Sequence, residues 1–127
     1  MADKFSESLE MYLETILLLI KDKDSVRQVE IADALAVSRP SVHASMRRMQ
    51  DDGLVIINAD SSVSLSAQGL EKARAIWERH EVFARFLIQI GVDPKTAQKD
   101  ACKIEHDVSE QTFQCIKAWC QAHCKHH

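Results

Sequence analysis

The sequence contains few of the residues that interrupt regular structure, and it has no long hydrophobic run. Glycine occurs 3 times and proline 2 times in 127 residues, so long helices with few turns are expected. The longest aliphatic run, residues 16–20, is far shorter than the roughly 20 residues that a membrane helix needs. The first residues lack the basic and then apolar pattern of a signal peptide. We therefore expect a cytoplasmic protein with no membrane partner.

The sequence also lacks a strong charge of either sign, and it has no cysteine before residue 102. Lysine and arginine total 16 against 19 acidic residues, a net charge of −3, so any surface that binds nucleic acid must be local. The cysteines are Cys102, Cys115, Cys120 and Cys124. In a reducing cytosol such thiols are expected to be metal ligands or free thiols rather than disulfides.

Apolar periodicity predicts a helix over residues 5–22. The residues that recur at the spacing of one helical face are Leu9, Leu13, Ile16, Leu17 and Ile20. Met11 falls nearly opposite this stripe, on the acidic face that also carries Glu14. Contact with another helix would explain an apolar residue at that position, and so would a role as a thioether ligand of a metal.

Two short helices and two β-prone runs follow. Residues 27–36 predict one helix, and a second begins after Ser38, a good N-cap, with Pro40 in its first turn. Residues 54–58 and 62–66 predict two strands around a turn. This order of elements is typical of a winged helix-turn-helix, whose second helix enters the major groove of DNA.

The outward face of that second helix is the candidate DNA-binding surface. Arg39 and Arg47 are placed to reach phosphates or guanine edges, and His43 is placed to reach a base edge or a phosphate. The residues that we expect to contact double-stranded DNA are Arg27, Ser38, Arg39, Pro40, Ser41, His43, Arg47 and Arg48. Helix-turn-helix geometry also occurs in proteins that never bind DNA, and this is the alternative.

The second half of the chain is predicted to be all helical. Residues 66–90 predict one long Ser-capped helix, kinked near Gly69, and its inward residues are Ala73, Trp77, His80, Ala84 and Leu87. A histidine in such a stripe is more often a hydrogen-bonded core residue than a ligand. Asp93 and Pro94 begin a helix over 94–107, and Ser109 caps a last helix. We therefore expect a mainly α fold, with a winged helix-turn-helix at 1–68 and a helical domain at 69–127.

Cys102, Glu105 and His106 form the candidate metal site. On a helix over 94–107 they span an arc of about 100°, so their donor atoms can converge on one point. A thiolate, a carboxylate and an imidazole suit Fe(II), Co(II), Ni(II) or Zn(II), and they suit Mg(II) or Ca(II) poorly. Met11, Glu14 and His80 are candidates for a further ligand. The alternatives are that Cys102 is a small packing residue, or that zinc has a purely structural role.

Six motifs carry a resemblance to a known family. They are "EMYLETI" (10–16), "EIADALAVSRPSVHASMRRMQDDGLV" (30–55), "LSAQG" (65–69), "RHE" (79–81), "IGVD" (90–93) and "DACKIEHDVS" (100–109). In this order they resemble the diphtheria toxin repressor family of metal-dependent transcriptional regulators, which includes iron-dependent and manganese-dependent repressors. The resemblance implies a homodimer whose helical domain binds metal and dimerises. It also implies repression at palindromic operators of metal-homeostasis genes.

The resemblance also implies a ligand set. Met11, Cys102, Glu105 and His106 match the primary regulatory metal site of iron-type members. Manganese-type members have an acidic residue at both the Met11 and Cys102 positions. The sulfur donors therefore favour Fe(II) as the cofactor, with Mn(II), Co(II), Ni(II) or Zn(II) as alternatives.

A second metal site is also expected from the resemblance, with a mixed pattern of ligands. His80 matches a histidine of the ancillary site in iron-type members, but Ala84 and Gln98 stand where that site has a glutamate and a second histidine. Glu14 matches a glutamate of the second site in manganese-type members. Glu14 and His80 are therefore the candidate residues of a second site.

The C-terminal end offers another cluster that the resemblance does not explain. Cys120, His123 and Cys124 are spaced as ligands on one helical face, for a metal or redox site, or they belong to a frayed terminus. Rival functions are a manganese- or zinc-responsive regulator and a metal-independent DNA-binding dimer. An enzyme is not expected, since no nucleophile–base pair and no phosphate-binding glycine loop are visible, and no small organic substrate is expected.

Overall fold

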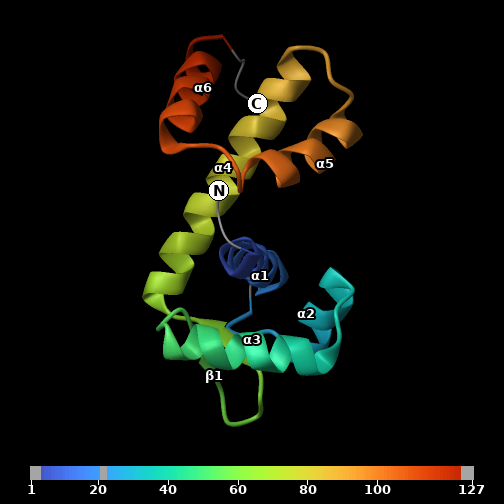
Figure 1. Ribbon diagram of the computed structural model, residues 1–127, viewed down its shortest axis with the longest axis vertical. Coiled ribbons are helices and arrows are strands. Elements are labelled where there is room, and N and C mark those ends of the chain that lie inside the picture. The colour runs from blue at the N-terminus through green and yellow to red at the C-terminus, as the bar shows by residue number, and fades with distance from the viewer. Residues whose placement is uncertain (1–3, 21–22, 124–127) are drawn as a thin grey trace. The chain divides into compact units, whose positions relative to one another are not determined.

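The computed structural model describes the backbone of residues 4–20 and 23–123 (Figure 1). Within these ranges the chain forms six helices and one two-stranded antiparallel sheet, so the predicted mainly α fold is confirmed. It divides into two compact units, an N-terminal unit that ends at Arg74 and a C-terminal unit that begins at Ala75. No helix in the described ranges is long and apolar enough to cross a membrane.

The N-terminal unit is a winged helix-turn-helix. Its elements are α1 (Lys4–Ile20), α2 (Gln28–Leu35), α3 (Arg39–Asp51), β1 (Val55–Ile57) and β2 (Val63–Leu65). The strands pair with Val55 opposite Leu65 and Ile57 opposite Val63, and Val26 adds a short bridge to Val63. The core contains the predicted apolar stripe of α3 and, from the predicted stripe of α1, Leu9, Leu13 and Ile16, whereas Leu17 and Ile20 are half-buried.

The start of α3 follows from local chemistry. The Ser38 hydroxyl accepts a hydrogen bond from the backbone N–H of Ser41 at 3.2 Å, and Pro40 lies in the first turn, as predicted. Val42, Met46 and Met49 have no exposed surface. Their burial fixes the rotation of α3, so that its opposite, polar face points to solvent.

Gly69 is required where α4 (Ala67–Gln89) starts beside the hairpin. The Ser66 hydroxyl donates to the carbonyl of Gly53 at 2.7 Å and accepts the Gly69 N–H at 2.9 Å, so the predicted serine cap is confirmed. A Cβ atom on residue 69 would lie 1.9 Å from the carbonyl oxygen of Leu54. Glycine is therefore needed for close backbone approach, and α4 runs through this position as one helix.

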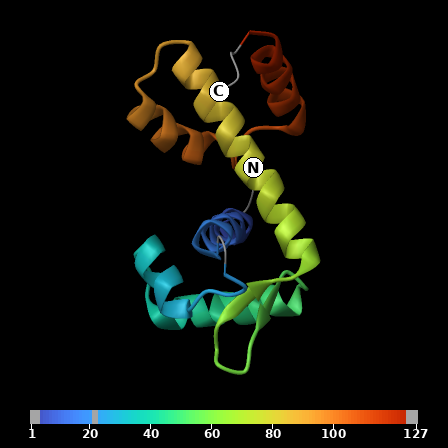
Figure 2. The same cartoon turned by 180° about the vertical axis from the view of Figure 1, so that it is seen from behind.

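The C-terminal unit packs two helices against the rest of α4. These are α5 (Pro94–Ile104) and α6 (Glu110–His123), and they lie on opposite sides of the C-terminal half of α4 (Figures 1 and 2). Phe83 of α4 and Phe113 of α6 meet in the core, with ring centroids 5.9 Å apart. Trp77 and Leu87, which the sequence predicts to be inward, are only half-buried, and Val82 and Phe83 are buried instead. A helix covered on two sides buries a wider arc than a single stripe.

Helix α5 ends earlier than the sequence predicts. Asp93 caps its start and Pro94 occupies its first turn, as expected, but the helix stops at Ile104 rather than at 107. Glu105 is the C-cap residue, and His106 lies in the turn that follows. The prediction that one helix carries Cys102, Glu105 and His106 is therefore wrong for His106.

Arg79 of α4 stabilises this ending. Its guanidinium donates one hydrogen bond to the carbonyl of Glu105 at 2.9 Å and another to the carbonyl of Val108 at 2.8 Å. These bonds satisfy carbonyl groups at and just beyond the end of α5, where no intrahelical N–H is available. Ser109 then starts α6 by accepting the backbone N–H of Thr112 at 3.2 Å, as predicted.

We expect Gly69→Ala to lower the free energy of unfolding by about 1–3 kcal/mol, because the new methyl group overlaps the backbone of Leu54. Urea unfolding followed by circular dichroism would measure the change. Glu71→Ala, an exposed position in the same helix, is the matched control and should change stability by less than about 0.5 kcal/mol. Equal midpoints for the two variants would contradict the close approach.

We expect Arg79→Leu to destabilise the C-terminal unit by about 1.5–3 kcal/mol, because two backbone carbonyls lose a charged donor. Trp77 and Trp119, the two tryptophans of the chain, both lie in this unit, so fluorescence during urea unfolding reports on it. Arg85→Leu, at an exposed site on α4, is the control. If both variants unfold at the same urea concentration, Arg79 does not hold the turn.

Candidate metal centre and DNA-binding face

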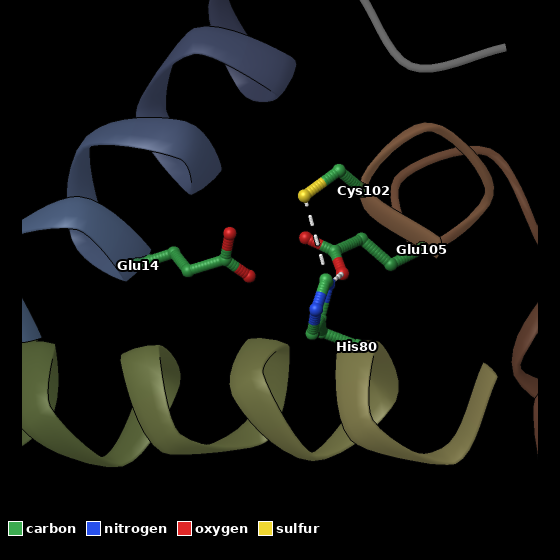
Figure 3. A group of neighbouring side chains, drawn as sticks. All are labelled: Glu14, His80, Cys102 and Glu105. Atoms are coloured by element: carbon green, nitrogen blue, oxygen red, sulfur yellow. Dashed lines mark hydrogen bonds and ion pairs between the residues drawn. The ribbon is translucent and has the colours of Figure 1, made fainter. Parts of the chain in front are cut away.

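Three potential metal ligands meet inside the C-terminal unit: His80, Cys102 and Glu105 (Figure 3). His80 comes from α4, Cys102 from the last turn of α5, and Glu105 from the C-cap of α5. The Nδ1 atom of His80 lies 2.8 Å from Oε2 of Glu105 and 3.6 Å from Sγ of Cys102. Their ligand atoms all lie within 4.8 Å of one another, which is close enough to share one ion.

The polar atoms of this cluster are buried. His80 is 4 % exposed and Glu105 is 1 % exposed, while Cys102 is half-buried. Burying a carboxylate is unfavourable unless it is paired or binds a cation. A nitrogen, a sulfur and an oxygen donor at this spacing fit a divalent transition ion and do not fit Mg(II) or Ca(II).

His106 lies on the other side of Glu105. Its side chain is 7 % exposed, and its Nε2 atom is 3.3 Å from Oε1 of Glu105. The sequence grouped His106 with Cys102 and Glu105 and assigned His80 to a second site. The structure brings His80 to Cys102 and places His106 at the second oxygen of the shared carboxylate.

Met11 and Glu14 lie on α1 in the N-terminal unit. Met11 is 40 % exposed, so its thioether is accessible on the surface of the helix. Glu14 is 6 % exposed, and its Oε2 atom is buried with no hydrogen-bond partner among the described residues. A buried carboxylate oxygen of this kind is a suitable ligand for a cation.

The residues of the C-terminal Cys/His cluster have other contacts. The thiol of Cys120 is buried, 3.9 Å from the carbonyl oxygen of Val82. Nδ1 of His123 lies 2.9 Å from the carbonyl oxygen of Trp119, and the two rings stack at 4.4 Å. Cys124 lies outside the described residues.

The predicted DNA-contacting residues are all exposed in the N-terminal unit. They are Arg27, Ser38, Arg39, Pro40, Ser41, His43, Arg47 and Arg48. Arg27, Arg39 and His43 line a groove of about 520 Å³ that residues 60–62 of the hairpin turn close on one side. The groove therefore brings basic side chains from α3 and from the start of α2 beside the wing.

Gln28 connects the two sides of this groove. Its side-chain amide donates to the carbonyl of Ser61 at 2.9 Å, and its Oε1 atom is 3.4 Å from Nδ1 of His43. In the hairpin turn, Ser62 donates two hydrogen bonds to the carboxylate of Asp60, and both lower the pKa of that carboxyl group. The bond from the Ser62 side chain has the larger effect, and the bond from its backbone has the smaller one. The wing therefore presents a negative charge, while α3 presents positive charge.

Two residues with clear roles, Gln28 and Arg79, were not singled out by sequence reasoning. Trp77 was predicted only as an inward residue, but its ring stacks on His80 at 4.9 Å. Gln98 was noted only as a replaced ligand, yet its Oε1 atom lies 2.7 Å from Nε2 of His80. Each of these contacts except the one from Trp77 joins segments that are far apart in the sequence. Periodicity and capping carry no signal for such pairs.

Known families match both units of the chain. Residues 4–63 match the iron dependent repressor N-terminal DNA binding domain, and residues 66–126 match the iron dependent repressor metal binding and dimerisation domain. Together the two matches account for nearly all of the sequence.

Individual relatives agree with this assignment. The transcriptional regulator MntR of Escherichia coli O157:H7 is 36% identical over 117 residues, which cover 92% of this chain and 76% of that protein. The diphtheria toxin repressor of Corynebacterium diphtheriae is 33% identical over 106 residues, which cover 83% of this chain and 47% of that protein. A solved manganese-dependent transcriptional repressor in complex with manganese superposes with a TM-score of 0.79 at 26% identity, covering 87% of this chain. The chain spans about half the length of the latter two, 47% and 51%.

The geometry and the comparisons lead to the same assignment. The chain has a DNA-binding domain, a dimerisation domain and a divalent-metal site with His, Cys and Glu ligands, and it is a regulator rather than an enzyme. It belongs to the iron-dependent repressor family, the metal-dependent transcriptional repressors related to the diphtheria toxin repressor.

Proposed function

We propose that this protein is a homodimeric, Fe(II)-responsive repressor that binds palindromic operators of metal-homeostasis genes in the cytoplasm. The observation that carries the proposal is the cluster of His80, Cys102 and Glu105 in the unit that matches a metal-binding and dimerisation domain. The exposed basic face of α3, in the unit that matches a DNA-binding domain, supports operator binding.

The sulfur donor supports the choice of iron over manganese. Thiolate is a soft ligand, and Mn(II) binds nitrogen and sulfur sites more weakly than the later divalent metals do. Cys102 therefore favours Fe(II), Co(II), Ni(II) or Zn(II) over Mn(II) in physical terms. The resemblance of Met11, Cys102, Glu105 and His106 to the iron-type ligand set selects Fe(II) from this group.

We further propose that Met11 and Glu14 of α1 and His106 complete the coordination begun by the C-terminal cluster. The buried Oε2 of Glu14, which has no hydrogen-bond partner in the part of the chain that the structure describes, supports this role. The positive charge of a bound metal would compensate the negative charges of the thiolate and the carboxylates. Ligands from both units would favour one relative arrangement of the units, because any other arrangement loses part of the ligand set.

Metal binding and operator binding are thermodynamically linked. If metal favours the arrangement that binds the operator, operator DNA must strengthen metal binding by the same factor. A change from mostly inactive to mostly active protein needs about 5.5 kcal/mol of differential binding. In a two-fold dimer, the two copies of α3 would reach half-sites about one DNA turn, or a multiple of it, apart.

A manganese-responsive regulator is the second candidate. The buried carboxylate of Glu14 matches the manganese-type pattern, and relatives include MntR and a manganese-dependent repressor. Both candidates use the same fold and the same DNA-binding face. They differ in which metal gives the tighter operator complex at equal free concentration.

We expect operator binding to require metal, to prefer Fe(II) over Mn(II), and to weaken by about 10-fold or more in Cys102→Ala, because that variant loses its only thiolate donor in the cluster. Fluorescence anisotropy with genomic upstream fragments, under anaerobic conditions and buffered metal, would measure it. Cys115→Ala removes an exposed thiol and is the matched control. A preference for Mn(II) selects the second candidate, and equal binding in chelator identifies a metal-independent DNA-binding dimer.

We expect Arg39→Ala and Arg47→Ala each to weaken operator binding, because each side chain is exposed on the outward face of α3. Each phosphate contact that is lost should reduce the slope of log affinity against log salt by about 1. Arg74→Ala, which removes an exposed arginine from α4, serves as control and should leave the slope unchanged. Wild-type slopes in both α3 variants would exclude this face from phosphate contact.

A further inference from the structure

We propose that Gln98 is the positioning residue that commits His80 to the metal centre, by accepting a hydrogen bond from its Nε2–H and leaving Nδ1 as the ligand atom. The inference rests on the proposed function, in that it assumes a metal between His80, Cys102 and Glu105. It goes beyond that function by assigning a role to a residue outside the ligand set.

The chemistry of imidazole makes this assignment specific. In a neutral histidine one ring nitrogen carries a proton and the other has a free lone pair, and only the latter binds a metal. Nε2 of His80 lies 2.7 Å from Oε1 of Gln98, an oxygen that can only accept. Nδ1 faces Oε2 of Glu105 at 2.8 Å and Sγ of Cys102 at 3.6 Å. A neutral ring has one N–H and cannot donate both to Gln98 from Nε2 and to Glu105 from Nδ1. When a metal takes Nδ1 in place of a proton, the remaining ring proton is on Nε2, where Gln98 accepts it.

Trp77 and Gln98 fix different degrees of freedom of the ring. The Trp77 ring stacks on the imidazole at 4.9 Å with an interplanar angle of 11°, which holds the plane of the ring. Stacking does not distinguish the two orientations related by a half-turn within that plane. The hydrogen bond to Gln98 does distinguish them, as does the contact of Nδ1 with Glu105, because a half-turn would replace each nitrogen by a carbon atom.

The position of Gln98 on α5 links orientation to ligand supply. Gln98, Cys102 and Glu105 are spaced four and three residues apart, so they share one side of the helix, the side that faces His80. Helix α5 thus supplies two metal ligands, Cys102 and Glu105. It also supplies Gln98, the hydrogen-bond acceptor that orients the third ligand, His80. Gln98 is exposed whereas His80 is 4 % exposed, so this hydrogen bond closes the outer edge of the cluster.

This arrangement has a consequence for stoichiometry. With Nε2 protonated and bonded to a neutral amide, His80 has one lone pair to offer and serves one metal only. Outer hydrogen bonds of this kind typically change metal affinity by about 10–100-fold.

Long-range proton–nitrogen NMR correlations of protein labelled with ¹⁵N-histidine would test the proposal, with Zn(II) as the diamagnetic probe. We expect wild-type His80 to show a protonated Nε2 and a metal-bound Nδ1. Gln98→Leu should bind Zn(II) about 10–100-fold more weakly, because the Nε2 proton of the metal-bound ring has lost its acceptor. Gln98→Glu keeps an acceptor oxygen and should not lose Zn(II) affinity.

Gln114→Leu makes the same substitution at an exposed glutamine on α6 and is the matched control. Gln98→Leu should unfold at the same urea concentration as this control. Equal stability would show that a weaker metal affinity comes from lost positioning of His80 and not from a general loss of stability. An unchanged Zn(II) affinity in Gln98→Leu would overturn the proposal, while metal-dependent operator binding by the wild type would still stand. A wild-type Nδ1 resonance that does not respond to Zn(II) would overturn both.

Discussion

The guanidinium group of Arg79 holds the end of α5 against α4, and the candidate metal centre depends on this contact. Arg79 binds the backbone carbonyl of Glu105, and its neighbour His80 meets the carboxylate of the same residue. Two consecutive residues of α4 therefore fix Glu105 at both its backbone and its side chain. Without the first contact, the Glu105 carbonyl at the end of α5 would lose its charged donor.

Neighbouring histidines explain how a buried carboxylate is tolerated inside a small helical unit. Both oxygens of Glu105 have a histidine nitrogen nearby, at 2.8 Å from His80 and at 3.3 Å from His106. A buried carboxylate without such neighbours would be strongly destabilising. The candidate metal ligands therefore already lie close together in the folded protein, so metal binding needs little rearrangement of the chain.

Much of the fold could be predicted from local chemistry. Ser38, Asp93 and Ser109 start helices through hydrogen bonds that span two or three residues, and the apolar stripe of α3 is buried as its spacing predicts. The end of α5 could not be predicted, because Arg79 lies 26 residues away from the carbonyl it binds. For the same reason, the spacing placed Cys102 and Glu105 together but could not show which histidine faces the thiol.

The amide of Gln28 also has a consequence for how the DNA-reading surface meets its target. Because it contacts the hairpin turn at Ser61 and the ring of His43 together, the wing and the recognition helix share one set of restrained side chains. The rotational freedom of these groups has already been lost in the free protein. Binding to DNA therefore costs less conformational entropy at these side chains. This part of the surface is preformed before it contacts the double helix.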